Sequence, residues 1–244
     1  SDGSPVADAD VWAGVYDCCG GNGDRTDGDG YFLIEGLTPG DYRVQASVPS
    51  EPSLVGEFFS STQSWTDAAR VTVNAGTTTP GIDFSLIAGG SISGRVVTAA
   101  SGTAVSGAWM WASSYDESGG GNGDQTDSDG YYTITGLAPG TYRVNADGSQ
   151  FGFISQFYTG TDQYDQATAV TVNVGTTTMD IDFALVVGGS ISGLVTNASG
   201  TPVAGADVFG DKDSCCGGGY DQTGPDGTYE LTGLSDGSYR VRGQ

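Results

Sequence analysis

The chain has 244 residues, of which 42 are glycine, and its 30 acidic against 8 basic residues give a net charge of −22. A surface this negative argues against nucleic acid and against anionic membranes as partners, because both are polyanions. Long helices are disfavoured, since each glycine costs about 1 kcal/mol relative to alanine inside a helix. No apolar run is long enough for membrane insertion.

One nine-residue stretch occurs three times and organises the rest of the sequence. Its copies span residues 36–44, 136–144 and 233–241 and share the pattern Gly-Leu-x-x-Gly-x-Tyr-Arg-Val. The Pro-Gly or Asp-Gly pair at its centre predicts a tight turn. In the strand that follows, Tyr and Val share one face and Arg takes the other. This spacing is typical of a tyrosine corner, in which the Tyr hydroxyl bonds to nearby backbone.

Other segments repeat at a fixed distance. Gly-Gly-Ser-Ile-Ser-Gly at residues 89–94 returns at 188–193, and Val-Thr-Val-Asn at 71–74 returns at 170–173, each 99 positions later. The repeats predict three similar β units, which span residues 1–88, 89–187 and 188–244.

Only the middle unit contains every repeated segment. Residues 1–47 match residues 198–244, so the first unit lacks the Gly-Gly-Ser-Ile-Ser-Gly strand and the third stops just after its tyrosine-corner strand. Two interpretations follow. The chain is a window on a longer tandem protein, or neighbouring chains complete the end units by adding strands, since an unpaired half-domain exposes sheet edges.

Seven short stretches of the middle unit alternate apolar and polar residues, as half-buried strands do. They cover residues 91–98, 108–113, 130–135, 140–146, 151–159, 168–173 and 179–186. Short strands with Gly-rich turns indicate an all-β sandwich. The alternation predicts a core of Ile92, Val96, Trp109, Trp111, Tyr132, Ile134, Tyr142, Val144, Val170, Val172, Ile181 and Phe183.

Four motifs carry a resemblance to a known family. The middle unit has Gly-x-Ile-x-Gly-x-Val at 90–96, Thr-Asp-x-Asp-Gly-Tyr-Tyr at 126–132 and Gly-Leu-x-Pro-Gly-x-Tyr-x-Val at 136–144, and the third unit has Gly-Thr-Pro-Val-Ala-Gly-Ala-x-Val at 200–208. Their order resembles the carboxypeptidase regulatory-like domain, which is similar in fold to transthyretin and to the B-type repeats of bacterial collagen adhesins. The resemblance implies a tandem array of seven-stranded Greek-key β-sandwiches, used as a stalk, spacer or accessory module and seldom as a catalyst.

Aspartate-rich loops are the first candidate site. The carboxylates are Asp24, Asp27 and Asp29 in the first unit and Asp124, Asp127 and Asp129 in the second, whereas the third unit keeps only Asp221 and Asp226. Alternating carboxylates on a Gly-containing loop offer the oxygen ligands that Ca²⁺ requires. The competing interpretation is a hairpin turn, because Asp-Gly is itself a favoured turn pair and the full EF-hand pattern is absent. Calcium is the only cofactor that the sequence suggests.

Four cysteines form two adjacent pairs, Cys18-Cys19 and Cys215-Cys216, at equivalent places in the first and third units. In an extended array these units do not touch, so we expect the pairs to staple neighbouring molecules by disulfides. Two alternatives stay open: a bond between adjacent cysteines, which is strained because neighbouring Cα atoms lie only 3.8 Å apart, and free or metal-binding thiols.

Aromatic and glycosylation positions complete the candidates. Trp65 and Tyr164 lie on equivalent loops and could stack on sugar rings or line an interface. Trp109 and Trp111 share one face of their strand, which favours a place in the core over a role in ligand binding. Asn197 begins the sequon Asn-Ala-Ser, a glycosylation acceptor.

Catalysis finds no support. The chain contains no histidine, which excludes His-based triads and the common zinc-protease motifs. The sequence therefore predicts a non-enzymatic protein of an extracellular fibre, filament or cell-surface stalk, which assembles with itself, has strands shared between neighbours and is cross-linked by disulfides. The alternative is a calcium-dependent adhesin or a carbohydrate-binding module of a secreted enzyme, with glycans as partners.

Overall fold

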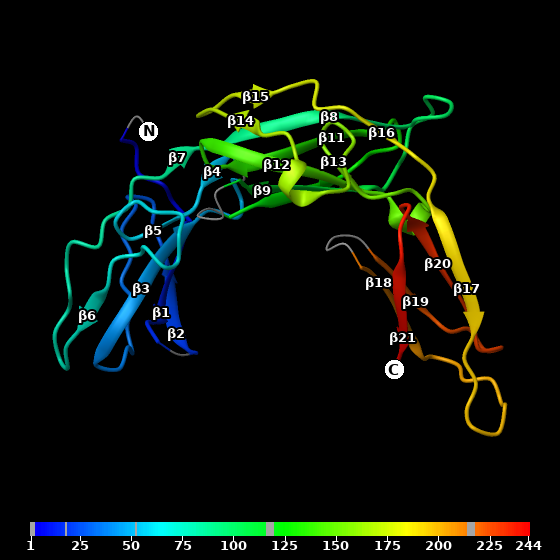
Figure 1. The fold of residues 1–244 in the computed structure, drawn as a ribbon. Coiled ribbons are helices and arrows are strands. Elements are labelled where there is room, and N and C mark those ends of the chain that lie inside the picture. The colour runs from blue at the N-terminus through cyan, green and yellow to red at the C-terminus, as the bar shows by residue number, and fades with distance from the viewer. Residues whose placement is uncertain (1–2, 18, 52, 116–119, 214–217) are drawn as a thin grey trace.

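The computed structural model describes residues 3–244 except residues 18, 52, 116–119 and 214–217. The regular structure of these residues is almost entirely β-strand (Figure 1), so the predicted all-β class is confirmed. The helical segments described are short 3-10 turns, η1 (Ser149–Phe151) and η2 (Tyr164–Gln166). No helix within this part of the chain has the length and apolar character needed to cross a bilayer.

The middle unit is a sandwich of two sheets. Its strands are β8 (Gly90–Thr98), β9 (Trp109–Ser114), β10 (Asn122–Gln125), β11 (Tyr131–Leu137), β12 (Gly140–Asp147), β13 (Gln156–Phe157), β14 (Val170–Val172), β15 (Thr177–Thr178) and β16 (Phe183–Leu185). One sheet has the order β10-β9-β12-β13, with β14 also on β12, and the other has the order β11-β8-β15, with β16 also on β8. β8 is therefore the central strand of the second sheet, antiparallel to β11 and parallel to β15 and β16.

The first four predicted strands of the middle unit agree with β8, β9, β11 and β12 to within two residues at each end. The predicted strands at 151–159 and 179–186 are too long, because Gly152, Thr159 and Asp180 have left-handed φ values of 79°, 74° and 63°, which interrupt an extended chain. β10 was missed: the first part of the Asp-rich loop is an edge strand that pairs with β9.

The core prediction is wrong for Trp109 and Trp111, which point outward from β9 and are 54% and 50% exposed. The inward face of this strand carries Ala108, Met110 and Ala112, all fully buried. A period of two shows that one face lies inside without showing which one, and here the smaller side chains take the crowded side. The other predicted core residues are buried.

The first unit forms one of the two sheets. Its strands are β1 (Asp10–Val15), β2 (Gly21–Arg25), β3 (Gly40–Ser47), β4 (Leu54–Val55), β5 (Glu57–Phe58), β6 (Val71–Val73) and β7 (Ile87–Ala88). The order β2-β1-β3-β5, with β6 on β3, repeats the first sheet of the middle unit. Residues 31–37 and 77–86, which correspond to β11 and to β15 with β16, adopt no strand.

The third unit holds a different selection of strands. They are β17 (Gly189–Leu194), β18 (Asp207–Lys212), β19 (Gly218–Gln222), β20 (Thr228–Leu234) and β21 (Tyr239–Gly243). One sheet has the order β19-β18-β21, and the other is the pair β17-β20. β17 corresponds to β8, but within the described residues it pairs only with β20.

The three tyrosine corners are confirmed. The hydroxyl groups of Tyr42, Tyr142 and Tyr239 donate to backbone carbonyls four residues upstream, at oxygen–oxygen distances of 2.8, 2.8 and 2.7 Å. Each bond fixes the turn in front of the strand to the strand itself, which is why the same stretch recurs in every unit.

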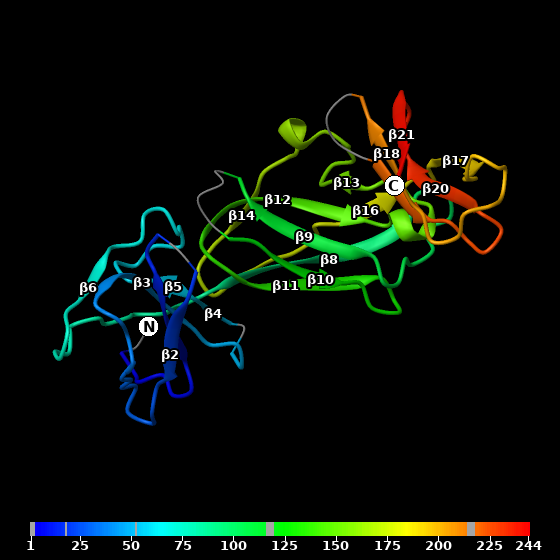
Figure 2. The same cartoon turned by 90° about the horizontal axis from the view of Figure 1, so that it is seen from below.

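The buried side chains and those packed against them form three separate clusters along the chain. The first lies within residues 6–86, the second within residues 92–185 and the third within residues 191–239. Each falls inside one predicted unit, while the exact boundaries at 88 and 187 stay a prediction. Figures 1 and 2 both show the first and third units at opposite ends of the middle unit, and in Figure 1 both extend to the same side of it.

Candidate functional site: the joints between units

Consecutive units meet at two places, which we call the first joint (residues 53–55, 87–89 and 136) and the second joint (residues 152–154, 187, 188 and 233). In the second joint the amide of Gly188 donates to the carbonyl oxygen of Gly152 at 2.9 Å, and Phe153 forms an antiparallel bridge with Val187. A Cβ on Gly188 would lie 2.5 Å from the backbone of Gly233. Only glycine allows two backbones to approach this closely.

The first joint repeats this arrangement 99 residues earlier. The amide of Gly89 donates to the carbonyl oxygen of Ser53 at 2.7 Å, and Leu54 pairs with Ala88 between β4 and β7. A Cβ on Gly89 would lie 3.1 Å from the Cα of Gly136. The linker of each unit is thus held by the same backbone contacts in both joints.

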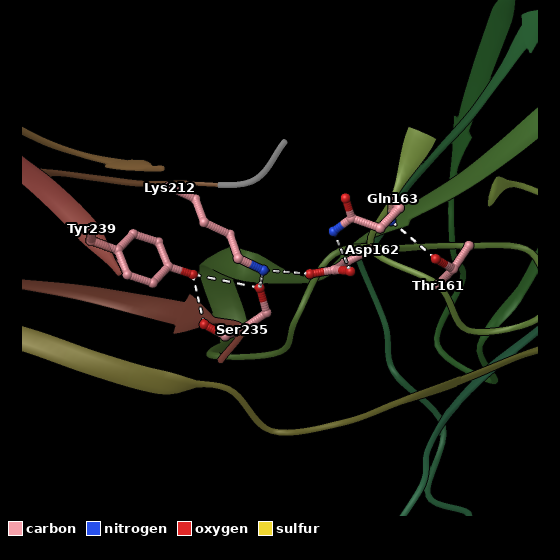
Figure 3. Close-up of polar contacts among 6 residues, drawn as sticks. All are labelled: Thr161, Asp162, Gln163, Lys212, Ser235 and Tyr239. Carbon is pink, nitrogen blue, oxygen red and sulfur yellow. Dashed lines mark hydrogen bonds and ion pairs between the residues drawn. The ribbon is translucent and has the colours of Figure 1, made fainter. Parts of the chain in front are cut away.

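The second joint also contains an ion pair, shown in Figure 3. Lys212 on β18 reaches across to Asp162 of the middle unit, with 2.7 Å between Nζ and the carboxylate, and also donates to the hydroxyl of Ser235 at 2.7 Å. Its side chain is only 7% exposed. Gln163 donates to the same carboxylate at 2.8 Å, so Asp162 accepts from both units.

The hydrogen bond from the Lys212 ammonium, helped by that from Gln163, lowers the pKa of Asp162 to about 2. The same contact raises the pKa of Lys212. Both partners therefore stay charged over the whole neutral range, and the contact is maintained there as a charge-assisted bond.

A cavity of about 460 Å³ lies beside this ion pair, between the middle and third units. Its wall includes Trp111, Asp147, Tyr164 and Tyr239. Two hydrogen bonds from Ser155 and Ser149 outweigh burial and lower the pKa of Asp147, which keeps it ionised. The Asp147 carboxylate thus accepts from hydroxyl and amide donors of its own unit.

The carboxylates of the Asp-rich loops act as backbone acceptors. Asp24 accepts from the amide of Leu33 at 2.7 Å, and this bond lowers the pKa of the carboxyl group. Asp124 accepts from Thr133 in the same way at 2.7 Å. The matching carboxylate of the third unit, Asp221, bonds the amide of Glu230 at 2.7 Å. Each bond ties the edge strand of one sheet to the segment that faces it in the other.

Asp27 and Asp127 shape the turn that follows. Asp27 accepts from the amides of Asp29 and Tyr31, both at 2.9 Å, and Asp127 accepts from Asp129 and Tyr131. Among the described residues no three acidic or cysteine side chains gather closely enough to hold a metal ion. The turn interpretation explains the geometry, and calcium binding at these loops stays a prediction.

Most of the cysteines fall outside the described residues, namely Cys18, Cys215 and Cys216. Cys19 lies exposed in the turn between β1 and β2. By sequence the two pairs belong to the first and third units, which lie at opposite ends of the middle unit (Figure 1). Their connectivity stays a prediction.

Trp65 and Tyr164, predicted to stack on sugars or to line an interface, stack on buried arginines, and their role in binding stays a prediction. The guanidinium of Arg43 lies 3.6 Å from the ring centre of Tyr16 and 4.5 Å from that of Trp65. Arg143 lies 4.1 Å from the ring of Tyr164 in the same manner. Such cation–π contacts, with the arginines donating to nearby carbonyls, cover the outer face of the strand.

These arginines were missed as structural residues, although they occupy the sixth residue after the turn-opening Leu in the repeated stretch. Their partner aromatics Tyr16 and Tyr115 directly follow β1 and β9, the equivalent strands of the first and middle units. In the third unit Asp213 takes this place and binds Arg240 as an exposed ion pair at 2.8 Å. The residue that follows this strand therefore distinguishes the units: where it is Tyr, the Arg of the repeated stretch stacks on it and is buried, and where it is Asp, the Arg forms an exposed ion pair. This pairing of residue types could have been read from the sequence.

Asn197, the predicted glycosylation residue, lies exposed in the loop after β17. Its side-chain oxygen accepts from the amides of Ser199 and Thr201, each at 3.0 Å. These bonds form a local turn. Glycosylation stays a prediction.

Comparison with known proteins bears on the middle unit. Residues 91–186 match the model of the carboxypeptidase regulatory-like domain family, so the resemblance predicted from the motifs is confirmed for this part of the chain. Comparison with curated proteins gives no significant match.

Three solved structures show a more distant likeness. The Bacillus anthracis TIE protein has 14% identity and a TM-score of 0.33, and the match covers 99% of this chain and 42% of that one. GBS52, the minor pilin of Streptococcus agalactiae, has 13% identity and a TM-score of 0.34, and the match covers 75% of this chain and 84% of that one. The shaft pilin SpaA of Lactobacillus rhamnosus GG has 10% identity and a TM-score of 0.34, and the match covers 77% of this chain and 91% of that one. Scores this low define neither a shared arrangement of units nor a shared function.

Proposed function

We propose that the chain is a structural, non-catalytic section of an extracellular fibre, filament or cell-surface stalk. The observation that carries this proposal is the repeated joint, in which the Gly89 and Gly188 amides bind the preceding unit through equivalent contacts. A contact that recurs along a chain places each unit on the last by one geometry, and this is how extended arrays are built. The net charge of −22 favours solubility of such an array by self-repulsion.

Cross-linking is a further part of the proposal. Cys19 is exposed, and in the sequence the second cysteine pair belongs to the third unit, which lies at the opposite end of the middle unit from the first (Figure 1). Disulfides from these turns would therefore join neighbouring molecules and add covalent strength to the assembly.

Electron microscopy of the native material, untreated and after reduction, tests the proposal. We expect ordered filaments or stalks that fragment when the disulfides are reduced. Filaments that resist reduction would contradict the proposed cross-links and leave the structural role standing. Separate globular particles in the native material would contradict the structural role itself.

Glycan binding is the second candidate function, and the outward pair Trp109 and Trp111 favours it. The two rings stand on one exposed face of β9, a position from which flat aromatic surfaces can stack on sugars. Binding on a glycan array that disappears in the Trp111→Ala variant would support this function, and an array without any bound glycan would remove it.

A further inference from the structure

The outer face of the first sheet in the middle unit carries a row of three side chains that do not belong to the core. In the strand register Asn145 on β12 lies between Trp111 on β9 and Phe157 on β13. Side chains directly opposite each other on neighbouring strands have Cβ atoms about 4.5–5.5 Å apart. Each of the three keeps exposed surface. The row therefore presents one amide between two flat apolar rings.

Both rings of this row are held in place by their neighbours. A Cβ on Gly123 of β10 would lie 2.6 Å from Cε3 of Trp111, so glycine leaves room for the indole to lie against the backbone of the edge strand. On the other side the ring of Tyr164 meets that of Phe157 edge to face, with centroids 5.8 Å apart. The fold thus fixes the position of both rings, which reduces the entropy cost of binding a ligand.

The first unit contains the same row. Gln45 on β3 lies between Trp12 on β1 and Phe58 on β5. A Cβ on Gly23 would lie 2.9 Å from the ring of Trp12. Trp65 meets Phe58 edge to face, with centroids 5.6 Å apart. An amide between two positioned rings is therefore a shared feature of the outer face in both units.

The middle unit extends this row, whereas the first unit does not. Asp147 lies opposite Trp109 on the same outer face, two residues along each strand from the first row. In the first unit the equivalent places hold Ser47 and Asp10, and Asp10 is paired with Arg25 at 2.7 Å. Of these two units, the middle one alone adds a carboxylate and a second indole to the row.

Part of this outer face lines the cavity of about 460 Å³ between the middle and third units. The wall includes Trp111, Asn145, Asp147 and Phe157 of the middle unit and Tyr239 of the third. The volume falls within the range of about 300–1,000 Å³ that is typical of small-molecule sites. The cavity combines aromatic surface with an amide and a carboxylate, so its ligand needs both apolar and polar groups.

Such a combination suits a pyranose ring, which has an apolar face of C–H groups and hydroxyls around its edge. The apolar face stacks on an indole. Asn145 uses one of its amide hydrogens to donate to the carbonyl of Gln156 at 3.2 Å, and an amide offers a second donor and an acceptor. Asp147 accepts from Ser149 and Ser155, and a carboxylate has further acceptor capacity for sugar hydroxyls.

We propose that this cavity binds an uncharged pyranose unit of an oligosaccharide. The sugar stacks on Trp111, and its hydroxyls exchange hydrogen bonds with Asn145 and Asp147. Anionic sugars are disfavoured, because the chain has a net charge of −22 and the cavity contains a carboxylate. The inference rests on glycan binding, the second candidate function, for which it names the site and the class of sugar.

Calorimetric titration of the full chain tests the inference. The ligands are oligomers of glucose, mannose and N-acetylglucosamine, with oligomers of galacturonate and glucosamine as charged counterparts. We expect one of the neutral oligomers to bind. Trp111→Ala should weaken its binding about tenfold or more, and Asn145→Ala about fivefold, as expected for one hydrogen bond. Asp147→Asn should reduce the discrimination against galacturonate.

The matched control is Trp12→Ala. It removes an indole of nearly the same exposure, 51% against 50% for Trp111, from the row of the first unit. Because that unit lacks the second row, Trp12→Ala should leave the affinity for the neutral oligomer unchanged. Circular dichroism of each variant checks that the fold is kept. An equal loss of affinity in Trp12→Ala and Trp111→Ala would overturn the assignment to this cavity.

The remaining outcomes separate the site from the function on which it rests. Binding that depends on Trp111 but is unchanged in both Asn145→Ala and Asp147→Asn would keep glycan binding and overturn the site in the cavity. Equal affinity for glucose and galacturonate oligomers, or binding of glucosamine oligomers alone, would overturn the class of sugar. Absence of binding by every oligomer would overturn the inference, and a loss of self-association in Trp111→Ala would then assign this face to contacts between copies of the chain.

Discussion

The two joints share a backbone and differ in their side chains. In both, a glycine amide at the start of a unit bonds to the preceding unit, through Gly89 in the first joint and Gly188 in the second. Among the residues that the structure describes, the buried pair of Lys212 and Asp162 has a place only in the second joint. The matching positions in the first joint are Ser114, opposite Tyr142 in the strand register as Lys212 is opposite Tyr239, and Gln63.

This difference separates two tasks. Backbone contacts set how units are placed, because a glycine fixes how closely two chains approach. Side-chain contacts then adjust how firmly each joint is held. Sequence repeats of backbone-determining glycines therefore predict a regular array, while substitutions at the surrounding positions give each joint its own strength.

Replacement of the joint glycine has the largest expected effect. Gly188→Val places a Cγ-bearing side chain where a Cβ alone would be 2.5 Å from Gly233, and overpacking of this kind costs about 1–3 kcal/mol or more. We expect the third unit to unfold at a lower temperature in calorimetry and to move independently in small-angle scattering. The neighbouring change Gly189→Val is the control, because a Cβ there would make an ordinary van der Waals contact, 3.7 Å from the carbonyl oxygen of Leu234. Identical melting of the two variants would contradict the role of the close approach.

The equivalent change in the first joint should be milder. The nearest backbone atom to a Cβ on Gly89 is 3.1 Å away rather than 2.5 Å. We expect the unfolding temperature of the first unit to fall less in Gly89→Val than that of the third unit falls in Gly188→Val. This result would confirm that the distance between the two backbones determines how strongly each joint depends on its glycine.

Loss of the ion pair should have an intermediate effect. Lys212→Met removes the charge and keeps the apolar stem, leaving Asp162 with Gln163 and solvent; we expect the second joint to lose about 1 kcal/mol, since the carboxylate is 29% exposed and partly screened. Unfolding in urea measures this. The double variant Ser114→Lys with Gln63→Asp sharpens the comparison, because it should strengthen the first joint if side chains alone account for the difference.

The pH dependence of the second joint follows from the same pair. The pKa of Asp162 is about 2 in the folded chain and about 4 when unfolded, so the carboxylate stabilises the joint above pH of about 4 and the contribution is lost as the pH falls toward about 2. Thermal unfolding between these values should show the third unit destabilised first. In Asp162→Asn this part of the pH dependence should vanish; its persistence would assign the effect to other carboxylates.

Local patterns predicted much of the fold. Tyr42, Tyr142 and Tyr239 could be recognised as corners because turn and acceptor lie within four residues of the tyrosine. The orientation of Trp109 and Trp111 could not, since alternation leaves the inward face undetermined.

The ion pair of the second joint was beyond the reach of sequence patterns. Lys212 and Asp162 are 50 positions apart in different units, and neither is repeated elsewhere at its equivalent position. Arg43 and Arg143 were visible as repeats, yet their burial depends on Tyr16 and Tyr115 in another strand. Long-range contacts of this type become apparent only when the strands are placed side by side.

The smallest expected difference, one of pH profile alone, separates the tyrosine corner from the joint. Tyr239 donates to the carbonyl of Ser235, whose hydroxyl also accepts from Lys212, so this corner is connected to the ion pair (Figure 3). Tyr142 makes the equivalent bond to the carbonyl of Ala138, a residue that has no hydroxyl group to accept from a lysine. Both Tyr→Phe variants should lose about 1 kcal/mol for one hydrogen bond. Only Tyr239→Phe should also alter the acid-induced weakening of the second joint. Equal pH profiles for the two variants would mean that the corner holds its own unit and that the ion pair holds the joint without it.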